Sequence, residues 1–132
     1  MEKNKKILIG GIIIILLAIA AYFTFFGAQD KIYNEDTQGA INVKKGDTFK
    51  ITLKSNPTTG YQWNADFDET LIQLVDTSYK ADEPQLMGSG GTEIFEFKVI
   101  GSNSDTSIKF GYARSWESVP PIDEKSFEIK IK

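Results

Sequence analysis

The feature that most constrains the fold is an alternation of apolar and polar side chains that recurs from residue 41 to the end of the chain. Phe49, Ile51 and Leu53, for example, are separated by single polar residues. A period of two is typical of a β-strand that buries one of its faces. The pattern predicts about seven strands, at residues 41–43, 49–53, 61–67, 71–75, 95–99, 108–112 and 127–131.

No segment after residue 26 keeps the 3.6-residue period of a helix, so the sequence predicts an all-β domain. Turn-forming residues separate the expected strands, as at Gly46, Pro57 and Pro120. Seven short strands in roughly a hundred residues favour an immunoglobulin-like β-sandwich, with Trp63 as a core residue. A small Greek-key barrel is the alternative fold.

A second feature is an uncharged, strongly apolar run over residues 7–26. A helix of that length spans the roughly 30 Å hydrocarbon core of a bilayer. A cleaved signal peptide is the competing interpretation, but its apolar region is only about 7–15 residues long. In addition, Phe26 stands where a cleavage site needs a small residue. We therefore expect one N-terminal transmembrane helix that acts as an uncleaved signal anchor, and a secreted domain if it is cleaved.

The charges beside this run predict its orientation. Lys3, Lys5 and Lys6 precede it, and the positive-inside rule then places the N-terminus in the cytoplasm and the domain outside the cell. The expected organisation is a single-pass protein of the cell membrane. Its parts are a cytoplasmic basic tail (1–6), the transmembrane anchor (7–26), a polar tether (27–37) and the β-domain (38–132).

Composition excludes most enzymatic chemistry. The chain has no Cys and no His, so it cannot form a Ser-His-Asp triad, a Cys-His dyad, a disulfide or a usual zinc, haem or iron–sulfur site. The acidic cluster Asp66, Asp68 and Glu69 lacks the ligand spacing of an EF-hand. With a net charge of −3 the chain is also a poor partner for nucleic acid. We expect no enzyme, no cofactor and no metal.

Three segments between the expected strands are unusual in composition. In the first, Pro57 restricts the backbone and Gly60 permits a positive φ, which favours a stiff turn, although an ordinary solvated turn fits the same residues. The second is rich in glycine and is either a site of close backbone approach or a flexible connector. The third holds Arg114, the single arginine of the chain, close to Trp116. An Arg–Trp contact is suited to binding, but also to capping the sandwich.

Together these segments resemble the chagasin family of inhibitors of papain-like cysteine peptidases. The strings NPTTGY (56–61), LMGSGGTE (86–93) and RSW (114–116) match its three inhibitory loops in order and spacing, and the resemblance covers roughly residues 38–132. It implies an immunoglobulin-like sandwich whose loops enter the active-site cleft of the peptidase. Ser115 departs from the usual Arg-Pro-Trp of the family.

The resemblance also implies a role for each loop. The first would form the central wedge, with Thr58 and Thr59 near the catalytic cysteine and histidine of the target. The second would line one half of the cleft, and the third would grip the other half. The implied peptidase-binding residues are Asn56, Pro57, Thr58, Thr59, Gly60, Tyr61, Met87, Gly88, Ser89, Gly90, Gly91, Arg114 and Trp116.

The expected partner is therefore a papain-like cysteine peptidase, bound by a monomer. A function of another class stays open, because a fold does not by itself give a function. The same sandwich would serve as a non-inhibitory cell-surface adhesion or assembly module.

Overall fold

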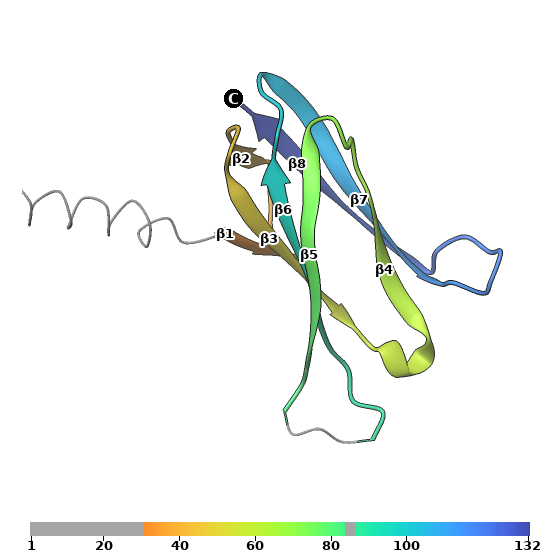
Figure 1. Cartoon of the computed structure of the whole chain (residues 1–132). Helices are drawn as coiled ribbons and strands as arrows, with labels where there is room; N and C mark the ends of the chain where they lie inside the picture. Colours follow the sequence, from red (N-terminus) through yellow and green to blue (C-terminus); the bar gives the residue numbers. More distant parts are fainter. Residues whose placement is uncertain (1–30, 84–86) are drawn as a thin grey trace, which may run out of the picture. The chain divides into compact units, whose positions relative to one another are not determined.

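The computed structural model describes residues 31–83 and 87–132, which form two four-stranded β-sheets (Figure 1). The first sheet has the order β1-β3-β6-β5 and contains β1 (Lys31–Asn34), β3 (Thr48–Ser55), β6 (Gly91–Val99) and β5 (Ile72–Ala81). The second sheet has the order β2-β8-β7-β4 and contains β2 (Ile41–Val43), β8 (Asp123–Ile131), β7 (Ser104–Arg114) and β4 (Tyr61–Asp66). A single 3-10 turn, η1 (Pro57–Thr59), joins β3 to β4.

These two sheets confirm the prediction of an all-β domain. Their order corresponds to the ABED and CFG sheets of immunoglobulin domains, with β2 as an added strand beside β8. The neighbouring strands are antiparallel, except that β1 runs parallel to β3 and β2 runs parallel to β8. Two separate sheets make the domain a sandwich and not the alternative barrel.

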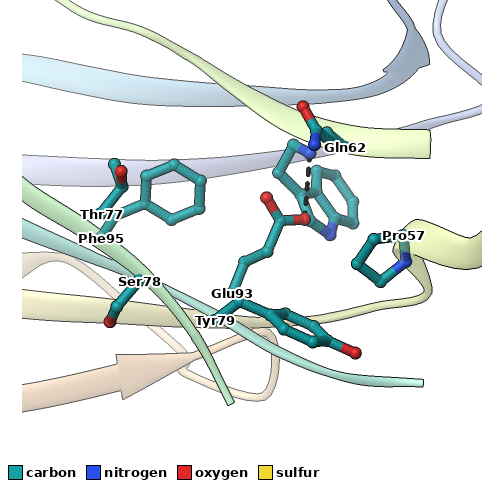
Figure 2. Close-up of a pocket in the computed structure, with 8 residues that line it drawn as sticks. Pro57, Gln62, Thr77, Ser78, Tyr79, Glu93 and Phe95 are labelled. Atoms are coloured by element: carbon teal, nitrogen blue, oxygen red, sulfur yellow. Dashed lines mark hydrogen bonds between the residues drawn. The ribbon is translucent and has the colours of Figure 1, made fainter. Parts of the chain in front are cut away.

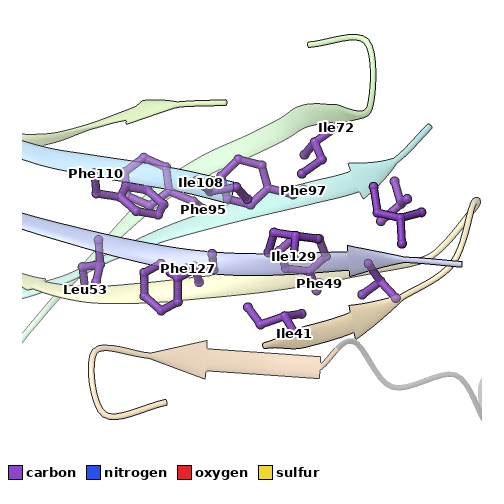
Figure 3. Close-up of a cluster of buried hydrophobic side chains, with 14 of the residues drawn as sticks. Ile41, Phe49, Leu53, Ile72, Phe95, Phe97, Ile108, Phe110, Phe127 and Ile129 are labelled. Atoms are coloured by element: carbon purple, nitrogen blue, oxygen red, sulfur yellow. The ribbon is translucent and has the colours of Figure 1, made fainter. Parts of the chain in front are cut away.

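The core lies between the sheets and is built from the alternating residues of the sequence pattern (Figure 3). Phe49 and Phe97 stack at 5.5 Å between ring centroids, and Phe95 contacts Phe110 at 5.0 Å. Trp63 is buried, as expected. Burying an aromatic or aliphatic side chain of this kind contributes roughly 1.5–3 kcal/mol, so these contacts hold the sheets together. Among the residues that the structure describes, the largest fully buried side chains are those of Ile41, Phe49, Ile51, Leu53, Ile72, Phe97, Val99, Ile108, Phe110 and Ile129.

The strand β1 differs from the expected organisation, because it lies within the segment 27–37 that we expected to be a tether. Only Tyr33 of its four residues is partly buried, so the strand has no alternating pattern. It forms because Tyr33 pairs with Ile51 in β3 and its ring packs edge-on against Phe49 at 6.3 Å. The sheet therefore includes residues from Lys31 onwards, seven residues before the boundary expected at residue 38.

The predicted basic tail and transmembrane anchor lie outside the residues that the structure describes. Across residues 31–83 and 87–132, the structure contains no helix of the length and apolarity needed to cross a membrane.

Candidate functional site

The strand directions bring the three unusual segments to the same end of the sandwich (Figure 1). Ser55, at the end of β3, and Ala81, at the end of β5, both pair with Gly91, and Tyr61 pairs with Arg114 at the end of β7. We call these segments the central turn (residues 56–61), the glycine loop (residues 87–91) and the Arg-Trp loop (residues 114–117). Segments more than fifty residues apart in sequence thus form one surface.

The central turn is stiff because its own polar groups are hydrogen-bonded. Asn56 Oδ1 accepts hydrogen bonds from the backbone N–H of Thr58 (3.3 Å) and from its hydroxyl (2.5 Å). Thr59 N–H donates to Asn56 O (3.1 Å), and Gly60 N–H donates to Pro57 O (2.9 Å). Gly60 has φ +84°, which residues with a Cβ rarely adopt. Thr58 and Thr59 lie exposed at the tip of this turn.

Tyr112 connects the central turn to the core. Its hydroxyl accepts the N–H of Asn56 at 2.9 Å, and its ring lies 4.7 Å from the ring of Trp63 and 5.3 Å from that of Tyr61. Trp63 in turn donates its indole N–H to the carbonyl of Lys54 at 2.9 Å. A continuous row of aromatic rings therefore fixes the turn relative to the buried part of the sandwich.

The glycine loop lies against one side of the central turn through its backbone. Asn56 Nδ2 donates a hydrogen bond to the carbonyl of Gly88 at 2.9 Å, and Gly88 itself has φ +79°. A Cβ on Gly90 would lie only 2.8 Å from the carbonyl oxygen of Ser55, so this close approach requires glycine. Ser89 is partly buried between these glycines. By contrast, the side chain of Met87 is fully exposed, at 105% of its reference accessibility.

Gly91, which we expected to belong to the peptidase-binding surface, is buried inside β6 instead. A Cβ at this position would lie 2.3 Å from the carbonyl oxygen of Lys80 and 2.5 Å from the hydroxyl of Tyr79. Its missing side chain allows β5 to pack closely beside β6. Gly91 therefore has a role in packing and does not contribute to the exposed surface.

The Arg-Trp loop lies against the opposite side of the central turn through side chains. Arg114 Nε donates to the carbonyl of Thr59 at 2.9 Å, and its guanidinium lies 4.2 Å above the centre of the Tyr61 ring. Its Nη1 forms an ion pair with Glu117 at 2.9 Å. This hydrogen bond with Glu117 raises the pKa of Arg114, so the guanidinium stays charged. Arg114 therefore fixes the position of its own loop relative to the turn.

Trp116 extends from this loop over the central turn. A Cβ on Gly60 would lie 2.1 Å from Trp116 Cη2, so the indole ring rests directly on the glycine. Even so, the side chain is 67% exposed, an unusual state for the largest apolar residue. Residues 114–117 form a turn in which Glu117 N–H donates to Arg114 O at 3.2 Å, with Ser115 at the second position.

A pocket opens beside the central turn, between the edge strands β4 and β5 (Figure 2). Pro57, Tyr79 and Glu93 are among the residues that line it. Because β4 is the outermost strand of its sheet, it has no neighbouring strand on the edge opposite β7, where the N–H of Trp63 donates a hydrogen bond. Glu93 Oε2, from the other sheet, accepts this hydrogen bond at 3.1 Å. The contact joins the two sheets near the turn.

Three residues of this network were missed by the sequence reasoning: Tyr112, Glu93 and Glu117. Their partners Asn56 and Trp63 are distant in sequence, so no local motif indicates the first two contacts. Glu117 lies three residues after Arg114, and this proximity is the one signal that was present.

The site has the properties of a binding surface. It presents the exposed side chains of Thr58, Thr59, Met87 and Trp116 from a backbone whose own polar groups are largely paired. Among the residues that the structure describes, no three carboxylates gather as metal ligands. A rigid exposed surface with apolar side chains at its edges is suited to contact with another macromolecule.

Comparisons with known proteins identify the relatives of this chain. The model of the family described as "Chagasin family peptidase inhibitor I42" matches residues 42–131. Amoebiasin-1 of Entamoeba histolytica is 32% identical over 100 residues, which are 74% of this chain and 92% of amoebiasin-1. Chagasin of Trypanosoma cruzi is 27% identical over 107 residues, 77% of this chain and 96% of chagasin.

The solved structures agree with this result. The crystal structure of the cysteine protease inhibitor EhICP2 from Entamoeba histolytica superposes with a TM-score of 0.67 at 26% identity. The alignment covers 77% of this chain and 94% of EhICP2. Because the family model covers more than half of the sequence, the assignment does not depend on a single motif. The chain belongs to the chagasin family of peptidase inhibitors.

Proposed function

We propose that this protein inhibits papain-like cysteine peptidases by inserting the central turn into their active-site cleft, with the glycine loop and the Arg-Trp loop on either side. Its family is one of inhibitors and not of enzymes, and EhICP2 is described as a cysteine protease inhibitor. One observation carries the proposal for the site. Both flanking loops are hydrogen-bonded to the central turn, through Asn56 on one side and Arg114 on the other.

This pairing supports tight binding because the loops are ordered before they meet the target. A loop that is already held in its bound shape loses little conformational entropy on association. In the proposed complex, Thr58 and Thr59 form the tip that approaches the catalytic residues. Met87, Gly88, Ser89 and Gly90 line one half of the cleft, and Arg114 and Trp116 contact the other.

The geometry of the central turn also explains why the inhibitor would survive. A peptidase cleaves a peptide bond whose carbonyl is free and aligned for attack by the nucleophile. In the central turn the carbonyl oxygens of Asn56, Pro57 and Thr59 already accept hydrogen bonds from Thr59, Gly60 and Arg114. A 3-10 turn offers none of them in an extended, substrate-like conformation. Binding would therefore block the cleft without turnover.

A titration of papain with the full chain, kept in a mild non-ionic detergent, tests the proposal. We expect activity to fall linearly to zero at one molecule of inhibitor per active site, with the inhibitor intact after prolonged incubation. A serine peptidase of similar size serves as the control and should stay active. An inhibitor with a native β-sheet circular dichroism spectrum that leaves papain active would contradict the proposal and favour the adhesion or assembly module.

The proposal includes the membrane anchor and the orientation expected from the sequence. Residues 7–26 would span the cell membrane once, with residues 1–6 in the cytoplasm and the inhibitory domain outside. The protein would act as a monomer, since all three loops come from one chain. Protease added to intact cells should then digest the domain and leave the anchor behind. A domain that stays protected until the cells are lysed would contradict this orientation.

A further inference from the structure

Met87 stands out among the residues of the site because its side chain has no structural role in the sandwich. It is the most exposed of the large apolar side chains that the structure describes, at 105% accessibility, compared with 67% for Trp116. Nevertheless, the backbone directly after it is fixed. The carbonyl of Gly88 accepts the hydrogen bond from Asn56, and Gly90 O accepts the N–H of Asp82 at 3.0 Å. The thioether is therefore presented to solvent from an anchored loop.

Met87 carries the one sulfur atom among the residues that the structure describes. The sequence contains no cysteine and two methionines, Met1 and Met87. A peroxide that reaches the inhibitor domain therefore finds a single thioether and no thiol. Thioethers react readily when they are exposed, and the product is reduced again by methionine sulfoxide reductases.

We infer that Met87 is a reversible oxidation site through which hydroperoxides switch off the inhibitor. This inference rests on the proposed function. The sulfur lone pair attacks one oxygen of the hydroperoxide, so that an S–O bond forms and the O–O bond breaks. The thioether loses two electrons, and the remaining hydroxide or alkoxide takes the proton of the transferred oxygen and leaves as water or an alcohol. Met87 becomes a sulfoxide, which is polar and a strong hydrogen-bond acceptor.

The consequence follows from where the side chain lies. Because Met87 contacts no core residue, its oxidation leaves the folded state and its stability unchanged. In the complex, the same side chain would lie against the peptidase cleft, where apolar surface is removed from water. A sulfoxide there loses the favourable burial and must be desolvated. Oxidation should therefore weaken inhibition by at least tenfold, mainly through faster dissociation.

The test compares the full chain in mild detergent before and after treatment with hydrogen peroxide, which catalase removes before papain is added. Peptide mapping by mass spectrometry distinguishes the sulfoxide of Met87 from that of Met1. Two variants complete the design. Met87→Leu keeps an apolar side chain that peroxide cannot oxidise, and Met87→Gln is a neutral polar mimic of the sulfoxide.

We expect the inhibition constant of the oxidised chain to rise at least tenfold, with an unchanged melting temperature and recovery after treatment with the reductase. Met87→Leu should inhibit equally before and after peroxide, and Met87→Gln should be about as weak as the oxidised chain. Equal inhibition by the oxidised and untreated chains would overturn the switch alone. The switch alone would also be overturned if peroxide weakens inhibition by Met87→Leu as much as inhibition by the unsubstituted chain. An untreated, folded chain that leaves papain active would instead overturn the proposed function, and the switch with it.

Discussion

Two turns at opposite ends of β4 have the same local hydrogen-bond pattern and different surroundings. In the central turn, Asn56 Oδ1 accepts the N–H and the hydroxyl of Thr58. At the other end of β4, Asp68 Oδ1 accepts the N–H of Thr70 at 2.9 Å and its hydroxyl at 2.5 Å. The residue after each threonine donates its N–H to the carbonyl of the Asn or Asp at 3.1 Å. We call residues 68–71 the far turn.

The difference lies in what holds each turn from outside. The far turn is fixed by the backbone between β6 and β7, because Ile100 and Gly101 both donate their N–H groups to Leu71 O. The central turn is fixed by its two neighbouring loops: its Asn56 side chain donates to the Gly88 carbonyl, and its Thr59 carbonyl accepts from the Arg114 side chain. Its Gly60 supports Trp116. A local turn motif therefore gives stiffness, whereas contacts with residues distant in sequence make one of two similar turns a candidate binding site.

The largest expected effect comes from placing the same residue in both turns. Thr58→Arg and Thr70→Arg each lose only the hydroxyl hydrogen bond to Asn56 or Asp68, so each should cost about 1 kcal/mol of stability. Inhibition of papain should fall at least a hundredfold for Thr58→Arg, since a charged side chain at the centre of an interface blocks it. Thr70→Arg should inhibit normally. If both variants retain full inhibition, the central turn does not enter the cleft.

The second prediction uses two glycines with the same backbone strain. Gly60 has φ +84° and Gly46 has φ +93°, so alanine at either position should cost about 1–2 kcal/mol of stability. A Cβ meets the Trp116 ring at Gly60, whereas at Gly46 nothing lies within 4 Å. Gly60→Ala should therefore displace Trp116 and weaken inhibition about thirtyfold. An equal loss of inhibition for Gly46→Ala would show that strain, and not the position of Trp116, is responsible.

The third prediction concerns the connection between the central turn and the core. Tyr112→Phe keeps the stack of rings but leaves the N–H of Asn56 without its acceptor. The lost hydrogen bond should lower the free energy of unfolding by about 1–3 kcal/mol, and the shifted turn should inhibit about tenfold less well. Tyr33→Phe, on the edge strand β1, is the matched control and should change neither quantity. Unchanged inhibition by a destabilised Tyr112→Phe would limit this tyrosine to a structural role.

The fourth prediction tests Ser115, where the sequence departs from the Arg-Pro-Trp pattern. Ser115 occupies the second position of a turn closed by Glu117 N–H and Arg114 O, which is a position that favours proline. Ser115→Pro should reduce the entropy of the free loop by about 0.4–1 kcal/mol. Inhibition should then tighten about two- to fivefold at roughly 1.4 kcal/mol per decade. Weaker inhibition would mean that this loop must bend when it binds.

The smallest effect is a difference in pH dependence between the two turns. The hydrogen bonds from Thr70 lower the pKa of Asp68 below its ordinary value of 3.8. Because the pKa of Asp68 is lower in the folded state, its ionised carboxylate stabilises the far turn at pH values above the ordinary pKa. This contribution is lost as the pH falls through the lowered pKa. Asn56 does not titrate. The amide resonance of Thr70 should therefore shift in acid while that of Thr58 stays constant, and equal shifts would contradict the distinction.

The sequence was sufficient for most of the fold. Alternation in segments such as Phe49 to Leu53 reflects burial of one strand face, which is a local property, and it predicted seven of the eight strands. The strand β1 was missed because only Tyr33 faces the core. The second half of β5 was missed for the same reason, since residues 73–80 are all exposed and carry no pattern.

The candidate site was predictable in its loops but not in its connections. Proline, the glycines and Arg114 are visible as unusual residues, and the family resemblance gave their order. Tyr112 lay in an expected strand and Glu93 in the string matched to the second loop, and nothing local indicated their contacts, since their partners lie 56 and 30 residues away. Gly91 was assigned to the surface because a glycine in the sequence gives no sign of whether it is exposed or packed.

Protection of the target's catalytic cysteine tests the central claim most directly. Papain saturated with the full chain is treated with iodoacetamide, and the rate of alkylation is compared with that of papain mixed with Thr58→Arg. If the central turn occupies the cleft, the full chain should slow alkylation in proportion to the fraction of papain bound, and Thr58→Arg should give little protection. Unchanged alkylation in a saturated complex would contradict insertion of the central turn into the active site.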